Sequence, residues 1–217
     1  MTDATLTHLY FLLDRSGSMH SMQADTKGGF DAFIGDQRAT PGRCLVTLAQ
    51  FDDSYDVVYT DRDLAEVPPL ELVPRGSTAL LDALGRLITT AGERLAALPE
   101  DQRPGSVVVG VMTDGLENVS REWSQPRIKA LIEQQDRDYG WQFLYLGADQ
   151  DAVEEGMKMG FAAGKSMTYS RGKAKQSLSH LSANVGAYRE AVAAGAPSVA
   201  AKHLTDFTDD QRADAAD

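Results

Sequence analysis

Three oxygen-bearing side chains follow directly on one apolar segment near the start of the chain. The apolar run covers residues 9–13, and Asp14, Ser16 and Ser18 come immediately after it. A carboxylate and two hydroxyls are hard oxygen ligands, which suit a small divalent cation. Because the three residues span only five positions, we expect them to lie on one turn at the end of a buried strand. By itself the Asp-x-Ser-x-Ser pattern is also compatible with a helix-capping turn.

Two further segments carry side chains that would complete such a site. Thr78 opens a predicted helix, and Asp114 follows the apolar run 107–112. In open parallel sheets, ligands bind outside the carboxyl ends of the strands. If the strands before Asp14 and Asp114 are neighbours, both carboxylates reach the same crevice. Two carboxylates and three hydroxyls favour Mg²⁺, with Mn²⁺ and Ca²⁺ as alternatives, over zinc or copper.

Catalysis would require a base or nucleophile held beside the metal. His20 is the only histidine close to the site in sequence, and its position fits a solvent-facing residue in the first turn of a helix. The chain has no G-x-x-x-x-G-K-[ST] phosphate loop and no G-x-S-x-G elbow. Ser16 also stands where phosphatases of the haloacid-dehalogenase type have a second aspartate. We therefore expect a protein that is not an enzyme, with a metal-dependent hydrolase as the competing prediction.

The apolar segments predict the sheet that positions these side chains. Continuous apolar runs separated by helical segments are typical of parallel strands buried on both faces. Residues 55–59 follow a turn-like segment and predict an antiparallel edge strand, and residues 166–169 predict a further edge strand. The expected fold is a doubly wound, Rossmann-like α/β domain with helices on both faces of a mainly parallel six-stranded sheet. The runs that predict the buried strands are residues 9–13, 45–51, 107–112 and 141–146.

Apolar residues at helical spacing predict the connecting helices. Gly28 and Gly29 weaken the first helix, by about 1 kcal/mol each relative to alanine, and so predict a place of close packing or a kink. Gly195 followed by Pro197 is a typical helix stop, and we place the domain boundary there. Residues 1–195 form the predicted domain, and residues 196–217 form an acidic tail that we expect to be flexible. The expected helices cover residues 19–37, 78–98, 126–138, 149–159 and 173–194.

Bulk composition excludes several classes of partner. The chain has 217 residues and a net charge of −11, from 21 basic and 32 acidic residues. This balance argues against nucleic acids and anionic membranes as partners. Cys44 is the only cysteine, so it predicts a buried thiol and excludes a cysteine-based zinc cluster. Residues 1–7 have no basic segment or cleavage site, which leads us to expect a cytoplasmic protein. The oligomeric state stays open.

Three sequence motifs together resemble a known family. DRSGSM, GSTALLDAL and MTDGLEN, in that order, are similar to motifs of the von Willebrand factor A (vWA) domains of integrins and of many bacterial proteins. The resemblance covers about residues 5–195 and includes all three parts of the metal-ion-dependent adhesion site (MIDAS). It implies that two serines and one of Thr78 or Asp114 bind the metal directly, while the others act through water. The residues that the resemblance places around the metal are Asp14, Ser16, Ser18, Thr78 and Asp114.

The resemblance also implies a function. The segment Phe51-Asp52-Asp53 is similar to bacterial cytoplasmic members of the family. A metal with an open coordination position would bind an Asp or Glu of a partner protein, so we expect a divalent-metal-dependent protein-binding module. The alternative is an accessory subunit that couples an ATPase or a stress-response complex of the tellurium-resistance type to its substrate.

Residues around the motifs carry further expectations. Glu117 and Asn118 are expected at the rim of the site, and Arg15 is expected to face solvent. A cluster of basic residues predicts either a surface for an acidic partner or a solvated helix start. Its members are Lys165, Arg171, Lys173 and Lys175.

Overall fold

The fold is known from a computed structural model that describes residues 2–117 and 119–216. The described residues form one sheet with the strand order β3-β2-β1-β4-β5-β6. Every neighbouring pair is parallel except β2 with β3, which is antiparallel. This confirms the predicted doubly wound α/β fold with one antiparallel edge strand. The strands are β1 (Asp3–Asp14), β2 (Arg43–Phe51), β3 (Tyr55–Asp63), β4 (Pro104–Thr113), β5 (Gln142–Ala148) and β6 (Ser166–Tyr169).

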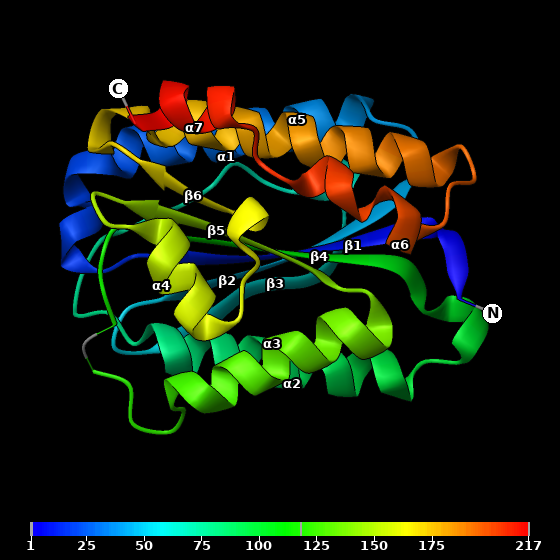
Figure 1. Cartoon of the computed structure of the whole chain (residues 1–217), viewed down its shortest axis with the longest axis horizontal. Coiled ribbons are helices and arrows are strands. Elements are labelled where there is room, and N and C mark those ends of the chain that lie inside the picture. Colours follow the sequence, from blue (N-terminus) through cyan, green and yellow to red (C-terminus); the bar gives the residue numbers. More distant parts are fainter. Residues whose placement is uncertain (1, 118, 217) are drawn as a thin grey trace.

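Helices cover both faces of the sheet (Figure 1). One face is covered by α1, α5 and α7, and the other by α2, α3 and α4. The predicted first helix starts later than expected, because residues Gly17–Met22 form a 3₁₀ helix before it. The helices are α1 (Gln23–Ala39), α2 (Leu80–Ala97), α3 (Gln125–Tyr139), α4 (Ala152–Met159), α5 (Ala174–Ala193), α6 (Ser198–Ala201) and α7 (Asp209–Ala216).

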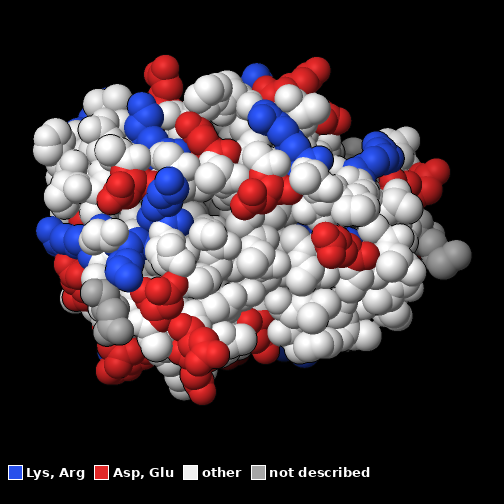
Figure 2. Space-filling view, turned by 90° about the horizontal axis from the view of Figure 1, so that it is seen from above, with Lys and Arg blue, Asp and Glu red and all other residues white. Residues whose placement is uncertain are grey.

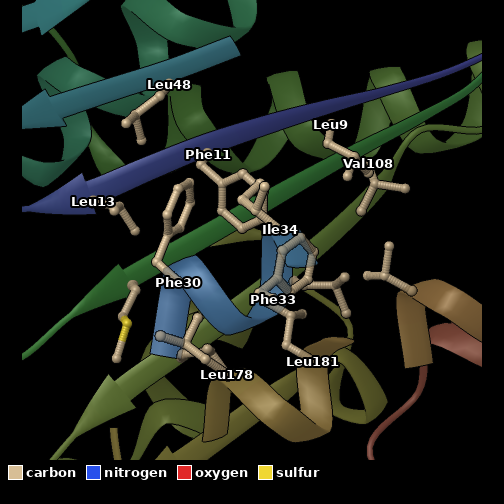
Figure 3. Packing of buried hydrophobic residues seen from close by; sticks show 14 of the residues in the cluster. Leu9, Phe11, Leu13, Phe30, Phe33, Ile34, Leu48, Val108, Leu178 and Leu181 are labelled. Carbon is tan, nitrogen blue, oxygen red and sulfur yellow. The ribbon is translucent and has the colours of Figure 1, made fainter. Parts of the chain in front are cut away.

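The central strand β1 contributes to two separate cores. Side chains alternate along a strand, so Phe11 and Leu12 point to opposite faces of the sheet. Phe11 packs edge-on against Phe30 and Phe33 of α1, with ring centroids 5.1 and 4.9 Å apart (Figure 3). Leu12 belongs to the core under α2 and α3. Both faces of β1 are therefore buried, as its continuous apolar sequence predicts.

Helices α1 and α5 approach each other closely at Gly29. A Cβ at this position would lie 2.9 Å from Leu178 Cδ1 and 3.0 Å from Lys175 Cα. A Cβ at Gly28 would meet nothing within 4 Å. Only the second glycine of the pair therefore explains the predicted close packing.

The acidic C-terminal segment differs from the expected flexible tail. It folds back as α6 and α7 against α5 and β6, and it buries Phe207 and Ala215. Arg212 donates hydrogen bonds to four main-chain oxygens, those of Ala163, Gly164, Ser166 and Phe207. The backbone N–H of Ser170 donates to Ala215 O at 2.9 Å. Composition alone does not predict this docking, because it depends on a few buried side chains and on the hydrogen bonds of one arginine.

Two simpler expectations can also be compared with the structure. Cys44 is buried with 5% of its surface exposed, in agreement with the predicted buried thiol. Within the described residues, no helix is both long enough and apolar enough to cross a bilayer.

Candidate metal centre

Two neighbouring strands bring the predicted carboxylates to the same edge of the sheet. Asp14 is the last residue of β1, and Asp114 follows the last residue of β4. The two strands run parallel, with Leu13 opposite Met112. Both carboxylates therefore lie at the carboxyl edge of the sheet, which is where ligands bind in folds of this type.

The Asp14 carboxylate is fully buried and held by two hydrogen bonds. Its Oδ1 accepts from Ser16 N at 2.6 Å, and its Oδ2 accepts from the Thr113 hydroxyl at 2.5 Å. Burial raises the pKa of Asp14 to about 6; the hydrogen bonds from Thr113 and Ser16 oppose this increase, and the charge of Asp114 adds to it. A cation at this edge would favour the charged form of the carboxyl.

The two serines and Asp114 form a chain of short contacts. The hydroxyl oxygens of Ser16 and Ser18 are 3.0 Å apart, and Ser18 Oγ donates to Asp114 Oδ1 at 2.6 Å. The second oxygen, Asp114 Oδ2, is buried and has no hydrogen-bond partner among the described residues. A buried carboxylate oxygen without a partner is costly. A cation beside it would provide the missing interaction, so the site fits a metal ion.

Thr78 lies against the residue that follows Asp114. It is buried, and a Cβ on Gly115 would come within 3.0 Å of its hydroxyl oxygen. Glycine at position 115 therefore allows the two loops to approach each other. Gly17 N also donates to Gly76 O at 3.2 Å, which joins the loop of the two serines to the loop of Thr78. The structure thus brings all five predicted residues to one place.

The donor set determines which kind of metal site is possible here. No group of three or more His, Cys, Asp or Glu side chains that could hold a metal occurs within residues 2–117 and 119–216. A metal at this edge would therefore need the hydroxyls of Ser16, Ser18 and Thr78 in addition to carboxylates. An all-oxygen set of this kind is typical of Mg²⁺ and Ca²⁺.

Arg15 is buried, contrary to the expectation that it faces solvent. It is only 9% exposed, and its Nε donates to Asp52 Oδ2 at 2.9 Å. Its NH2 group contacts Ser54 at 3.2 Å and also pairs with Asp56. The prediction is wrong because the partner carboxylates come from the turn after β2 and from β3, which the local sequence around Arg15 does not reveal.

Asp52 connects the loops that carry the candidate ligands. It accepts from Arg75 Nε at 2.9 Å as well as from Arg15, and its main-chain oxygen accepts from Ala79 N at 2.9 Å. Burial alone would raise the pKa of Asp52, but hydrogen bonds from Ser54, Arg75 and Arg15 outweigh it and hold that pKa well below its usual range. Asp52 therefore stays charged and fixes both the Arg15 loop and the residue after Thr78.

Glu117 stabilises the start of α2 and is not positioned as a metal ligand. Its carboxylate accepts from Leu81 N at 2.9 Å and from Ser120 N at 2.6 Å. Asp82 in turn accepts from three backbone N–H groups, those of Arg121, Glu122 and Trp123. These bonds hold the loop after Asp114 against α2.

The other predicted neighbours of the site have mixed outcomes. His20 is exposed, as expected, and Asn118 lies outside the described residues. Lys165 does not belong to a surface patch, because it is buried and donates to Lys202 O at 2.9 Å. Arg171 pairs with Asp149 at 2.6 Å. The four basic residues that lie close together in the sequence therefore do not form one surface patch in the folded protein.

Several solved structures have a similar fold. Proximal thread matrix protein 1 from the mussel byssus matches with a TM-score of 0.56 and 16% identity, over 84% of this chain and 47% of its own. A second structure of that protein, described as having a zinc-occupied MIDAS motif, matches with a TM-score of 0.54 and 16% identity, over 83% of this chain and 46% of its own. A von Willebrand factor type A structure from Catenulispora acidiphila matches with a TM-score of 0.53 and 15% identity, over 89% and 42%. This chain thus spans less than half the length of each.

The sequence by itself gives no match of this kind. No protein-family model and no curated protein matches the chain. At 15–16% identity the structural likeness concerns the fold alone. The described residues therefore adopt the fold of the von Willebrand factor A domain.

Proposed function

We propose that this protein is a vWA-family module with an intact MIDAS that binds a partner protein through a divalent metal. The observation that carries the proposal is Asp114 Oδ2, which is buried without a partner beside the hydroxyls of Ser16 and Ser18. Asp14, Ser16, Ser18, Thr78 and Asp114 hold the metal in this proposal. Mg²⁺ is the expected ion because every donor is oxygen.

The partner contributes an Asp or Glu to the metal. Ser18 is exposed, so the candidate site reaches the surface at this residue. Hydroxyl ligands are neutral, and the metal would therefore keep enough positive charge to attract a further carboxylate. Specificity would come from the loops around the site.

The proposed role is binding without catalysis. Three polar side chains near the site make structural contacts: Thr113 with Asp14, Arg15 with Asp52, and Glu117 with the start of α2. General-base catalysis would need a group held within hydrogen-bond reach of a substrate. A screen for hydrolysis of nucleotides, phosphate esters and peptides with Mg²⁺ tests this role. Turnover that disappears in Ser16→Ala would favour the enzyme instead.

The remaining expectations concern the protein's surroundings. On the face seen in Figure 2, acidic and basic residues lie side by side and no broad basic patch covers it, which supports a partner other than nucleic acid.

We also propose that the protein works in the cytoplasm of a bacterium, where a single buried thiol such as Cys44 stays reduced.

Titration calorimetry with Mg²⁺, Mn²⁺, Ca²⁺ and Zn²⁺ tests the metal site. We expect Asp114→Asn to weaken Mg²⁺ binding at least tenfold, because it removes the charge of the buried carboxylate. Asp25→Asn is the matched control, since Asp25 is an exposed acid in the first turn of α1. Equal Mg²⁺ affinity in both variants would contradict the site assignment.

A further inference from the structure

A large cavity lies far from the candidate metal centre, at the amino ends of the parallel strands. Its volume is about 650 Å³, and the first halves of β1 and β2 line it together with the end of α2. His8 precedes Asp14 by six residues on β1, which places about 20 Å between them. The cavity is therefore separate from the metal centre. Its lining includes Leu6, His8, Leu45, Leu95 and Leu98.

The imidazole of His8 is fixed in the wall of this cavity. Tyr10 lies two positions further along β1, on the same face of the sheet, and its ring stacks on His8 with centroids 4.0 Å apart. Trp141 continues the stack behind Tyr10, with centroids 6.2 Å apart. His8 Nε2 lies 2.9 Å from Thr47 Oγ1. The ring is therefore held on one face and at one nitrogen, so it cannot turn toward other partners.

The second nitrogen of the His8 ring has no partner in the protein. Within residues 2–117 and 119–216, no side chain or backbone group forms a hydrogen bond with Nδ1. His8 is only 1% exposed and lines the cavity, so the little surface that remains to it faces the cavity. A buried polar atom without a partner is costly. A polar group inside the cavity would supply the missing hydrogen bond.

Asp61 determines which kind of hydrogen bond is missing. Its Oδ1 lies 3.5 Å from His8 Nε2, and its backbone N–H donates to Thr47 Oγ1 at 3.1 Å. A carboxylate beside Nε2 favours the tautomer that carries the proton on this nitrogen. Burial lowers the pKa of His8 to about 4, although Asp61 opposes the change, so the ring is neutral at about pH 7. Nδ1 is then an acceptor, which requires an O–H or N–H donor.

The rest of the lining favours a neutral, mostly apolar molecule. The four leucines of the lining provide apolar surface from the sheet and from the end of α2. Arg43 pairs with Asp3 at 2.9 Å, and Arg94 pairs with Asp61. Asp101, the other charged residue in the lining, is exposed. A charged ligand would have to compete with these pairs, whereas a neutral one leaves both intact.

We propose that this cavity, the amino-edge cavity, binds a phenol, that is, a neutral molecule with a flat apolar body and an aromatic hydroxyl. The hydroxyl donates a hydrogen bond to His8 Nδ1, and the apolar body lies against the leucines. A phenolic O–H donates more strongly than an aliphatic one, which suits an imidazole acceptor. The volume of about 650 Å³ is in the range of small-molecule sites, so it has room for two fused rings. The proposal is independent of the proposed function.

Three related probes test the proposal on the full chain at about pH 7. They are 2-naphthol, naphthalene, which lacks the hydroxyl, and 2-naphthoate, which is an anion without a donor. Fluorescence titration gives the affinities. We expect 2-naphthol to bind about fivefold more tightly than naphthalene, as is typical for one added hydrogen bond, and 2-naphthoate to bind more weakly than 2-naphthol. A chelator should change none of these affinities.

Nitrogen-15 nuclear magnetic resonance of labelled histidines tests the contact directly. The Nδ1 signal of His8 should shift on addition of 2-naphthol and stay in place with naphthalene. His8→Phe identifies the signal and keeps a flat ring beside Tyr10 while it removes the acceptor. In this variant 2-naphthol and naphthalene should bind equally. His20→Phe is the matched control, since His20 is exposed and does not line the cavity, and it should retain the preference for 2-naphthol.

Two variants at the end of α2 test the location without a change to His8. Ala96 and Ala97 are neighbouring exposed residues, but only Ala97 lines the amino-edge cavity, and Ala96 lines a separate cavity between α2 and α3. We expect Ala97→Trp to fill the amino-edge cavity and abolish binding of 2-naphthol. Ala96→Trp should retain it. These variants keep the proposal testable even if His8→Phe does not fold.

Several results would overturn the proposal. One is the absence of binding by any of the three probes, and another is equal binding of 2-naphthol and naphthalene to the unmodified protein. Tighter binding of 2-naphthoate would show that the arginines at the rim select an acid instead. Loss of binding in Ala96→Trp but not in Ala97→Trp would place the probe in the other cavity. A preference for 2-naphthol that persists in His8→Phe would exclude the hydrogen bond to Nδ1.

Discussion

The guanidinium Nε of Arg15 lies 2.9 Å from Asp52 Oδ2, so a residue between two candidate metal ligands is paired with the turn after β2. Arg75 contacts the same oxygen at 2.9 Å. Asp52 is completely buried and charged, and its partners come from two loops that also carry Ser16 and Thr78. The buried carboxylate of Asp52 therefore holds together the two loops at the metal centre, although Asp52 is not itself a candidate ligand.

Replacement of this charge should affect both stability and metal binding. We expect Asp52→Ala to cost about 3 kcal/mol of unfolding free energy, because Arg15 is left buried without its main partner. Metal affinity should fall by about tenfold, as is typical when a residue that orients ligands is lost. Urea denaturation and Mg²⁺ calorimetry measure the two effects.

The exposed pair Arg86–Glu122 provides the control for Asp52. Its side chains are 47% and 54% exposed, so Glu122→Ala should cost less than about 1 kcal/mol. Mg²⁺ affinity should be unchanged in this variant. If Asp52→Ala behaves like Glu122→Ala in both measurements, Asp52 does not organise the metal centre.

Removal of the Asp14 carboxylate should abolish Mg²⁺ binding. Asp14→Ala leaves Ser16 N and the Thr113 hydroxyl without their acceptor and removes one of the two negative charges from the centre. The far-ultraviolet circular dichroism spectrum should remain close to that of the unmodified protein, because the sheet is held by many other contacts. Calorimetry that shows unchanged Mg²⁺ affinity would remove Asp14 from the site.

The two neighbouring glycines of α1 should respond in opposite directions to alanine. Gly29→Ala forces a Cβ to within 2.9 Å of Leu178 and should destabilise the protein by about 1–3 kcal/mol. Gly28→Ala meets nothing within 4 Å and should stabilise it by about 0.5–1 kcal/mol through higher helix propensity. Thermal and urea unfolding of the two variants measure these changes. Equal effects would show that α1 and α5 are not packed as closely as described.

His8 should make the protein less stable in mild acid. Burial lowers the pKa of His8 to about 4, although Asp61 opposes the change. The unfolded chain therefore binds a proton that the folded protein refuses between about pH 6.5 and pH 4, so stability falls as the pH falls through this window. As the pH falls from about 6.5 to 4, the unmodified protein should lose stability relative to His8→Gln in urea unfolding; the raised pKa of Asp14 acts in the opposite direction but is common to both proteins. An unchanged slope in this variant would mean that other groups cause the acid sensitivity.

The sequence predicts the sheet and the candidate ligands because both depend on local patterns. Each buried strand is a mostly apolar run, and Asp14 and Asp114 stand just after two such runs. The rule that parallel strands place their carboxyl ends along one edge then brings the two residues together. The fold follows from the same observations.

Features that depend on distant partners were missed. Arg15 and Asp52 are 37 residues apart, and Lys165 donates to Lys202, also 37 residues away. No local pattern indicates these pairs, so the sequence alone predicts a surface position for both basic residues. The docking of α7 was missed for a similar reason, since Arg212 binds backbone oxygens that any sequence would provide.

The position of α7 determines where anything joined to the end of the chain would lie. Ala215 O accepts from Ser170 N, and Ser170 directly follows β6, whose carboxyl end lies at the same edge of the sheet as Asp14 and Asp114. The two termini are at opposite ends of the molecule (Figure 1). A segment or fused domain after residue 217 would therefore start on the metal side. Tethering there raises the local concentration of a weak ligand into the millimolar range, so a purification tag belongs at the N-terminus and a tethered partner peptide at the C-terminus.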